Sequence, residues 1–348
     1  MNILSIESSC DETAAAVIKN GTHILSNVVV SQVDIFAAYG GVIPEIAARS
    51  HLETILPVIH QALNDANLTK NQIDAIAVTH TPGLLGSLLI GTLTARALAI
   101  LWHKPLYAVH HLKSHIYANW LESHRAPEFP LLALVISGGH TQILYMPAHN
   151  QFEIIGTTRD DAVGECFDKV AKILGLPYPG GPSISKLAFT GNPQAYPLPH
   201  PMIDNLDFSF SGLKTAVLRS VQQTCHLPIT TPSFELAHHL TDQMKADFAA
   251  SFEATACDIL LEKLQLALKT HPDIKSIVFA GGVSANQTLR QKAQTSPLNK
   301  KSLFFPAPQF TGDNAAMVGA AAYFEIESGT QPTDPYKLNI APRTNITN

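Results

Sequence analysis

The chain has 348 residues, 46% of them hydrophobic and 15% charged, and a formal net charge of -5. This composition excludes a disordered chain, and the length predicts two lobes with a large core. The mildly acidic balance argues against strong nucleic-acid binding by this chain alone, because such binding generally needs a basic surface, supplied by a local patch or by a partner.

The four cysteines and the first residues of the chain indicate a reducing compartment. The cysteines are widely spaced and form no Cys-x-x-Cys pair, so they predict neither a disulfide framework nor a zinc knuckle. The first residues lack the basic region of a signal peptide and include an early acid, Glu7. We therefore expect a cytoplasmic protein.

Residues 84–102 form the most apolar stretch of the chain. Their length suits a membrane span, but Arg96, several hydroxyl residues and two glycines interrupt them. This pattern favours a helix buried in protein, and we expect no membrane partner.

Three segments share one pattern, in which an apolar strand leads into a turn of small residues. The first is 1–18, with the turn around Ser8-Ser9-Cys10, and the second is 131–146, with the turn Ser137-Gly138-Gly139. The third, 277–286, leads instead into a helix from about Gln287. The repetition predicts an α/β fold built from a duplicated unit.

Other segments have the periodicity of helices. In 51–65, apolar residues recur from Leu52 to Leu63 at the spacing of one helix face, so we expect that face to pack inward. The stretch 190–207 is rich in Pro and Asn and predicts a loop. The other predicted elements are a strand over 73–78 and helices over 160–172, 234–270 with one break, and 313–324.

The turns after the first two strands are candidate anion sites. Successive backbone N–H groups in such turns form a cradle for phosphate or carboxylate, although ordinary hairpins use the same residues. Ser8-Ser9-Cys10 and Ser137-Gly138-Gly139 occupy equivalent places in the repeat, which favours the functional reading. Asp11 follows the first turn, where it could act on a metal, a water or an amine.

His111 and His115 lie four residues apart, so on a helix they share one face and could bind one metal ion. The spacing alone also fits two ordinary histidines. Asp313 precedes an apolar helix, where it could cap the helix or add an oxygen ligand and leave positions open for a substrate. A zincin-type metalloprotease is disfavoured, because Leu112 stands where that motif needs Glu.

Acids and glycines cluster in 160–182. Asp160 and Asp161 suit the first turn of a helix, whereas Asp168 lies one turn beyond Gly164, where a ligand could approach. For Asp168, recognition of a ligand hydroxyl competes with a surface salt bridge. Farther on, 208–215 mixes aromatic residues, hydroxyls and a lysine, and its spacing favours a buried Phe pair with exposed hydroxyls.

Together these motifs resemble the TsaD family of tRNA adenosine threonylcarbamoyltransferases, once described as O-sialoglycoprotein endopeptidases. The likeness covers nearly the whole chain. Two positions depart from the family pattern: Ser114 stands where Ala or Gly is usual, and Thr81 stands where Gly commonly precedes Pro-Gly. The matching motifs are 7–13, 39–45, 82–91, His111 with His115, 137–141, 160–172, 179–182, 208–215, 281–286 and Asp313-Asn314.

The resemblance implies a two-lobed actin/hexokinase/Hsp70-like (ASKHA) α/β fold with duplicated mixed-sheet subdomains. We expect one lobe over 1–110, completed by 328–348, and a second over 111–327, with the metal and substrate site at the cleft. The implied reaction transfers the threonylcarbamoyl group from threonylcarbamoyl-adenylate to the exocyclic amine of the adenosine 3′ of the anticodon, in tRNAs that read codons beginning with A. AMP is released.

The resemblance also implies the site residues and the partners. His111, His115 and Asp313 would hold one divalent metal ion, Fe²⁺ or Zn²⁺, and Asp11 would act as a general base or orient the amine. The implied partners are the tRNA, the TsaB and TsaE proteins, and TsaC, which makes the adenylate. The residues implied to bind the adenylate, and through it the ATP-derived AMP moiety, are Val135, Ile136, Ser137, Gly138, Gly139, Asp168, Gly181 and Asn286.

Two other functions compete at this stage. An ATP-dependent small-molecule kinase of the same fold would share the phosphate cradles but would not need the His-His-Asp group. A noncatalytic scaffold subunit of the tRNA-modifying complex should have lost the metal ligands or Asp11, and this chain retains all four.

Overall fold

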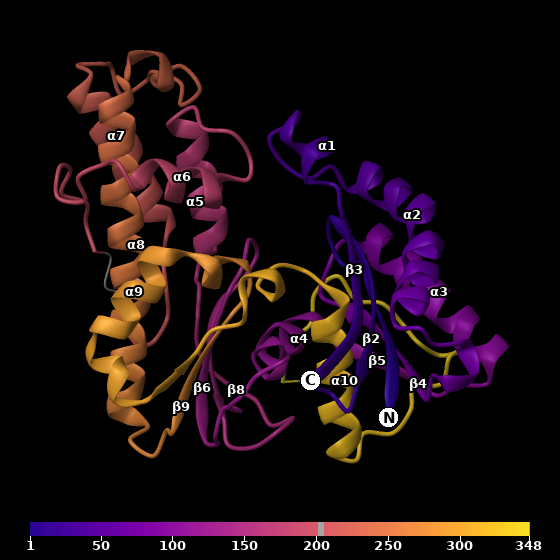
Figure 1. Cartoon of the computed structure of the whole chain (residues 1–348). Helices are drawn as coiled ribbons and strands as arrows, with labels where there is room; N and C mark the ends of the chain where they lie inside the picture. The colour runs from indigo at the N-terminus through magenta and orange to yellow at the C-terminus, as the bar shows by residue number, and fades with distance from the viewer. Residues whose placement is uncertain (201–204, 348) are drawn as a thin grey trace. The chain divides into compact units, whose positions relative to one another are not determined.

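The computed structural model describes residues 1–200 and 205–347 of the chain. The chain divides into two compact units, each with one five-stranded sheet and its covering helices (Figure 1). Unit 1 comprises Met1–Phe129, Met146–Glu153 and Phe304–Asn348, and unit 2 comprises Pro130–Tyr145 and Ile154–Leu303.

These limits differ from the lobes expected at 1–110 and 111–327. Helix α4 (His111–Tyr117) and helix α10 (Ala315–Glu327) both belong to unit 1. The reason is packing, because α10 contacts α4 as well as strands β1 (Asn2–Glu7) and β2 (Glu12–Lys19). The candidate metal ligands therefore all lie in unit 1.

The two sheets have the same strand order. In unit 1 the order is β3-β2-β1-β4-β5, and in unit 2 it is β8-β7-β6-β9-β10 when read in the same direction. Each sheet thus has its first strand in the centre and its fourth strand beside it, and these pairs, β1 with β4 and β6 with β9, are parallel. The predicted duplication is confirmed. The remaining strands are β3 (His23–Ser31), β4 (Ala75–Thr81), β5 (Leu106–His110), β6 (Leu131–Ile136), β7 (Thr141–Met146), β8 (Glu153–Thr157), β9 (Ser276–Ala280) and β10 (Ser302–Phe304).

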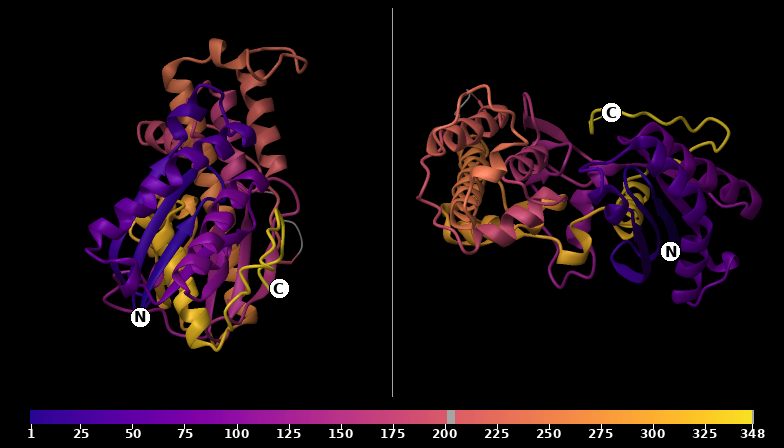
Figure 2. Two further views of the ribbon diagram at one scale, coloured as in Figure 1. Left: turned by 90° about the vertical axis from the view of Figure 1, so that its right-hand side faces the viewer. Right: turned by 90° about the horizontal axis from the view of Figure 1, so that it is seen from above.

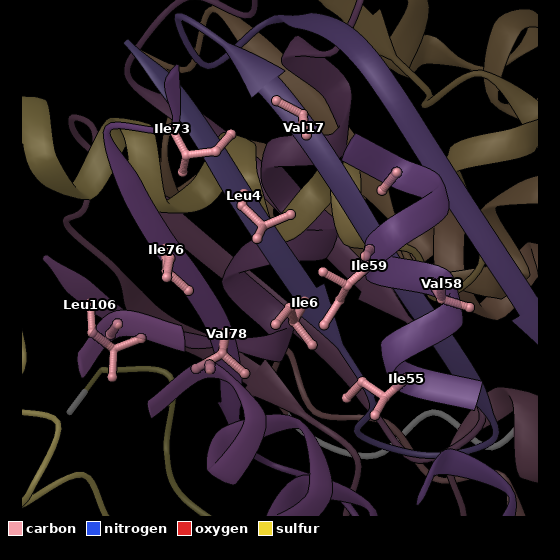
Figure 3. Packing of buried hydrophobic residues seen from close by; sticks show 14 of the residues in the cluster. Leu4, Ile6, Val17, Ile55, Val58, Ile59, Ile73, Ile76, Val78 and Leu106 are labelled. Carbon is pink, nitrogen blue, oxygen red and sulfur yellow. The ribbon is translucent and has the colours of Figure 1, made fainter. Parts of the chain in front are cut away.

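The core of unit 1 lies between its sheet and two helices, α2 (Pro44–Asp65) and α3 (Leu85–Trp102) (Figure 3). Leu4 and Ile6 of β1 point into this core because alternate strand residues face the same side. On the other side of the sheet, α10 approaches so closely that a Cβ at Gly319 would lie 2.7 Å from Ile18 Cγ1. Both faces of β1 are thus covered, which explains its nearly continuous apolar sequence.

Helices α2 and α3 expose more apolar surface than their sequences predicted. On α2, Ile55 and Ile59 are buried as expected, but Leu52 and Leu56 are 67% and 62% exposed. Helix α3 is the one described helix with the length and hydropathy of a membrane span, and 33% of it is buried. The expectation of a buried helix therefore holds for only one face of α3, and the opposite face carries exposed leucines, among them Leu89 and Leu93.

Unit 2 contains the long helix α8 (Asp242–Thr270), which the side chain of Thr241 caps. The expected break lies before it, where 3-10 turn Leu236–His239 ends. Residues 190–200 and 205–207 form turns and loop as predicted, and 201–204 of that predicted loop lie outside the described residues. The other helices of this unit are α5 (Val163–Ile173), α6 (Gly180–Ala188), α7 (Ser211–Thr224) and α9 (Gln287–Thr295), with 3-10 turns Gly282–Ala285 and Pro297–Lys300.

The segment after α10 runs in extended form along unit 1 (Figure 2). Thr81 holds it, because the hydroxyl of Thr81 donates to Ala341 O at 2.7 Å. The N–H of Gly83 also donates to Pro342 O, at 3.2 Å. The residue that departs from the family pattern at position 81 thus anchors this segment. Unit 1 further contains helix α1 (Val33–Ala37) and 3-10 turns Lys70–Gln72, Ala118–Trp120 and Pro308–Phe310.

Candidate functional site

The candidate metal site lies where the parallel strands β1, β4 and β5 end. The carboxyl ends of parallel strands meet at one edge of a sheet, and ligand sites favour that edge. Strand β1 ends at Glu7, β4 passes Thr79 close to its end, and β5 leads directly into α4, which begins at His111. The fold therefore brings these three residues together from distant parts of the sequence.

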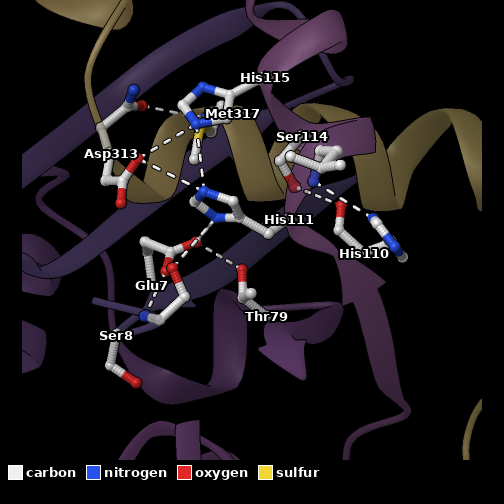
Figure 4. A network of polar contacts seen from close by, with 12 residues as sticks. Glu7, Ser8, Thr79, His110, His111, Ser114, His115, Asp313 and Met317 are labelled. Carbon is white, nitrogen blue, oxygen red and sulfur yellow. Dashed lines mark hydrogen bonds and ion pairs between the residues drawn. The ribbon is translucent and has the colours of Figure 1, made fainter. Parts of the chain in front are cut away.

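Three of the predicted side chains converge at this edge (Figure 4). The Nε2 atoms of His111 and His115 are 3.1 Å apart. The Oδ1 atom of Asp313 lies 3.5 Å from the first and 3.1 Å from the second. Helix α4 aligns the two rings because they are one turn apart, and Asp313 reaches them from the loop before α10.

These atoms fit the ligand set of one metal ion. Two imidazole nitrogens and one carboxylate oxygen within 4.8 Å of one another match the donors of a catalytic zinc or iron site, which leaves further positions open. Both histidines are buried, so the group is shielded from bulk water. The capping role considered for Asp313 belongs instead to Asn314, whose side chain accepts from Met317 N.

Glu7 orients the first histidine. Its carboxylate is fully buried and accepts hydrogen bonds from Thr79 Oγ1 at 2.6 Å and from Ser9 N at 2.6 Å. His111 Nδ1 lies 3.2 Å from Glu7 Oε2, so an Nδ1–H donated to Glu7 leaves Nε2 free to bind a metal. The sequence reasoning missed this role, although an acid at the end of a buried apolar strand was a visible signal.

The charges around His111 affect its protonation. Burial lowers the pKa of His111, but the carboxylates of Asp313 and Glu7 outweigh burial and raise that pKa to about 9. For Glu7, burial raises the pKa, and the contact with His111 more than reverses this, so the pKa of Glu7 is lowered. The site is thus arranged to hold positive charge.

Asp11 is half-buried in the turn between β1 and β2, the same turn that carries Ser9. The Oγ atom of Ser9 lies 3.2 Å from His111 Nδ1, so this turn contacts the histidine directly. Next to Asp11, burial together with the carboxylates of Asp313 and Asp11 raises the pKa of Glu12 to about 10. Glu12 is therefore protonated at neutral pH, while Asp11 lies in the same acidic neighbourhood as Asp313.

In unit 2, two Gly-rich turns follow neighbouring strands. Ser137-Gly138-Gly139 follows β6 and Gly281 follows β9, and these strands are parallel neighbours. Gly281 has a φ of +86°, and a Cβ there would lie 2.5 Å from Ile136 O, so this position requires glycine. A Cβ at Gly138 or Gly139 would meet nothing within 4 Å, so this turn has open space beside its backbone.

Val135 and Ile136, which were also predicted to bind the adenylate, form the end of β6. Their side chains are fully buried in the core. Only their backbone could take part. The turn itself is closed by Ser137, whose N–H donates to His140 O at 2.9 Å.

Helix α5 lies directly beside this turn. A Cβ at Gly164 would be 2.6 Å from Ser137 O, so glycine allows the helix start and the turn to touch. Asp168, one helical turn beyond Gly164, accepts from Gly180 N at 2.8 Å. Asp168 thus holds the start of α6 through a hydrogen bond to the backbone, an interaction that differs from the surface salt bridge considered above. At this helix start, Gly181 has open space around it.

Asn286 lies at the start of α9, and its side chain is hydrogen-bonded within unit 2. Its side-chain oxygen accepts from Leu289 N at 2.8 Å, which caps the helix. Its amide nitrogen donates to Ser185 Oγ at 3.0 Å and to Glu253 Oε1 at 2.6 Å. The position predicted for substrate binding therefore belongs to a hydrogen-bonded network that the sequence did not reveal.

Asp160 and Asp161 precede α5, which begins at Val163, so they do not lie in the first turn of a helix as expected. Both carboxylates instead contact residues at or beside the start of α7. Asp160 accepts hydrogen bonds from Ser211 Oγ at 2.6 Å and from Phe210 N at 2.8 Å. Although burial raises the pKa of Asp160, these bonds and one from Ser209 lower that pKa overall. Asp161 forms ion pairs with Lys169, whose Nζ lies 2.7 Å from Oδ1, and with Lys214, whose Nζ lies 2.9 Å from Oδ2. The hydroxyls of 208–215 thus serve to dock α7.

The chain is similar to known proteins over nearly its whole length. A model of the TsaD family, described as tRNA N6-adenosine threonylcarbamoyltransferase, matches residues 23–320. Proteins of that name are similar to this chain: one from Symbiobacterium thermophilum is 51% identical and covers 94% of this chain and 93% of its own length. One from Bacillus cereus is 47% identical, covering 99% and 96%.

Two solved structures share the fold. HypF from T. kodakarensis superimposes with a TM-score of 0.63 at 14% identity, covering 94% of this chain and 48% of HypF. Component A of the (R)-2-hydroxyglutaryl-CoA dehydratase of Acidaminococcus fermentans gives a TM-score of 0.51 at 15% identity, covering 94% and 99%. At these identities the likeness shows the fold alone, and it confirms the predicted ASKHA fold.

Proposed function

The chain belongs to the TsaD family of tRNA N6-adenosine threonylcarbamoyltransferases, and from this premise we propose that it transfers threonylcarbamoyl from threonylcarbamoyl-adenylate to tRNA. The acceptor is the exocyclic amine of the adenosine 3′ of the anticodon in tRNAs that read codons beginning with A, and AMP is released. The observation that carries this proposal is the convergence of His111, His115 and Asp313 in a chain of this family.

These three residues would hold one divalent ion, Fe²⁺ or Zn²⁺, since both accept two imidazoles and a carboxylate. When bound, such an ion polarises a carbonyl oxygen and stabilises the charge that develops there during acyl transfer. Glu7 holds the His111 ring so that Nε2 faces the ion position. Asp11 is half-exposed in the turn whose Ser9 contacts His111, and it would orient the attacking amine or accept its proton.

The open backbone of unit 2 would bind the adenylate. Gly138 and Gly139 would direct backbone N–H groups to a phosphate, because the space beside them is open. Asp168 and Gly181 lie at the start of α6, and Asn286 lies at the start of α9. Negative charge on the departing AMP is stabilised by such preorganised donors. The remaining task of the protein is to position the two reactants.

A partner protein is expected as well. Neighbouring helices α2 and α3 expose Leu52, Leu56, Leu89 and Leu93, and an exposed apolar surface of this kind is typical of protein interaction sites. TsaB and TsaE are the partners that the family resemblance names, with TsaC as the source of the adenylate. The acidic net charge also favours a partner that helps to bind tRNA, and we propose a cytoplasmic location for an enzyme that acts on tRNA.

The direct test compares His111→Ala and Asp313→Ala with the wild type, with exposed His23→Ala as the matched control. We expect both site variants to lose metal and to lose transfer by about a thousandfold or more, because several kcal/mol of charge stabilisation disappear. Circular dichroism should remain native, and the control should behave as the wild type.

Product analysis decides between this proposal and its rivals. ADP with a phosphorylated small molecule would identify a kinase, and full transfer by a metal-free double variant would contradict the role of the metal. If the assembled complex transferred threonylcarbamoyl without a contribution from these residues, the chain would be a scaffold.

A further inference from the structure

Glu253 is a buried carboxylate in the middle of α8 that the proposed mechanism does not use. Its residue is 4% exposed. Its Oε1 atom accepts from Ser185 Oγ at 2.6 Å and from Asn286 Nδ2 at 2.6 Å, and its Oε2 atom accepts from Thr288 Oγ1 at 2.7 Å. One carboxylate therefore gathers donors from two other helices, α6 and α9.

The surroundings of Glu253 argue against a purely stabilising role. Among residues 1–200 and 205–347, the hydrogen-bond donors to this carboxylate are neutral, and no ion pair includes it. A buried carboxylate without a cation is expensive, and packed apolar residues often stabilise such a position as well or better. In some proteins a buried polar group of this kind contributes precise alignment of its partners, and the three hydrogen bonds to Glu253 fit that role.

The groups that Glu253 aligns belong to the predicted substrate site. Ser185 lies on α6 one helical turn beyond Gly181, so these two residues share a face of α6. Asn286 lies at the start of α9. Asn286 also donates to Ser185 Oγ at 3.0 Å, which closes a small network with the carboxylate. Movement of either helix start would break at least one of these bonds.

We infer that Glu253 is a positioning residue for adenylate binding, which sets the orientation of the Asn286 carboxamide and the Ser185 hydroxyl and fixes the starts of α6 and α9 relative to each other. The inference rests on the proposed function, because it assumes that Asn286 and Gly181 contact the adenylate. Glu253 itself touches no reacting atom. Its effect should therefore appear in substrate affinity and much less in the maximal rate.

The test is Glu253→Gln in the full chain, assayed with its partners for transfer and alone for AMP binding by calorimetry. Loss of charge-assisted hydrogen bonds should raise the KM for the adenylate and the Kd for AMP about tenfold, with kcat within about twofold. Metal content should equal that of the wild type, and the melting temperature should be unchanged or higher. A merely structural role would lower the melting temperature and leave the KM of the folded enzyme unchanged.

Asp258→Asn is the matched control. Asp258 is on the same helix and also ties α8 to α9, through Lys292 at 2.6 Å, but at the other end of α9. This variant should keep the wild-type KM and Kd. If Glu253→Gln does not fold, Thr288→Val gives a second test, because it removes the donor to Oε2 without change of shape and should raise Kd about threefold.

Asn286→Ala tests the substrate site itself, separately from the positioning role of Glu253. If Asn286→Ala weakens AMP binding and both Glu253→Gln and Thr288→Val leave it unchanged, the positioning role is overturned while the substrate site stands. If none of the three variants changes AMP binding, the proposed substrate site fails, and the role of Glu253 fails with it. Weaker binding in all three, with Asp258→Asn unaffected, supports the inference.

Discussion

The two units share one strand order and yet carry different chemistry at the ends of their central strands. In unit 1, β1 ends at Glu7, and the candidate ligand atoms of His111, His115 and Asp313 come from α4 and the loop before α10. In unit 2, β6 ends in Ser137-Gly138-Gly139, a turn whose two glycines have open space beside their backbone.

The two sheets thus provide equivalent strand ends, and the residues at each strand end determine which kind of ligand could bind there. Side chains that converge from separate elements suit a metal ion, whose ligands must surround a point. A turn of glycines suits a phosphate, because the backbone itself must approach the ligand. Changes in unit 1 should therefore affect metal affinity, and changes in unit 2 should affect nucleotide affinity.

The largest difference between the two units is expected for Glu7→Gln, which should weaken metal affinity in unit 1 only. Without the carboxylate, the His111 ring loses the partner that fixes its tautomer, and loss of such a partner typically weakens metal affinity about 10- to 100-fold. Competition with a chromophoric chelator measures this affinity, and AMP binding should not change.

Glu12→Gln provides the matched control for that experiment. With a pKa raised to about 10 by burial and the nearby carboxylates, Glu12 is already neutral at pH 7, so a neutral amide should change metal affinity little. Equal losses in the two variants would contradict a specific role for Glu7.

The pH dependence of the two sites should also differ. Burial lowers the pKa of His111, but the carboxylates of Asp313 and Glu7 raise it to about 9, so below that pH the ring must release a proton to bind a metal. Metal affinity should therefore rise with pH, by up to about tenfold per unit between pH 6 and pH 8.

Calorimetry in buffers of different ionisation enthalpy would count the released protons. Binding of AMP to backbone amides should vary much less over the same range, apart from titration of the phosphate. A metal affinity that falls as pH rises would contradict the assigned protonation.

The smallest effect is expected for Gly164→Ala in unit 2. Its Cβ would lie 2.6 Å from Ser137 O, and such overpacking costs about 1–3 kcal/mol, which should raise the KM for the adenylate about tenfold as the turn shifts. Gly212→Ala is the control, because a Cβ there meets nothing within 4 Å. Metal content should be the same in both variants. A loss of metal in Gly164→Ala would contradict the expectation that changes in unit 2 leave the metal site of unit 1 unaffected.

The sequence predicted the strand ends well because alternation and small-residue turns are local signals. Strand β6 was expected from Leu131 to Ile136 and is found there, and α9 begins at Gln287 as predicted. The metal group was predicted from the spacing of His111 and His115 together with family motifs, and its convergence with Asp313 agrees with that expectation.

What the sequence did not predict depends on contacts between distant residues. Glu7 meets Thr79 and His111, and Glu253 meets Ser185, at separations that no periodicity records. Periodicity likewise tells which residues of a helix share a face, but not how much of the helix is covered, so the exposed leucines of α2 were expected inside.

We propose that unit 1 holds one metal ion through His111, His115 and Asp313. Anomalous diffraction from crystals of the purified protein, recorded at the absorption edges of iron and zinc, is the most direct test of this claim. We predict one peak at about 2.0–2.2 Å from the Nε2 atoms of both histidines and from a carboxylate oxygen of Asp313. A metal peak bound by other residues, with these three side chains not coordinating it, would contradict the claim.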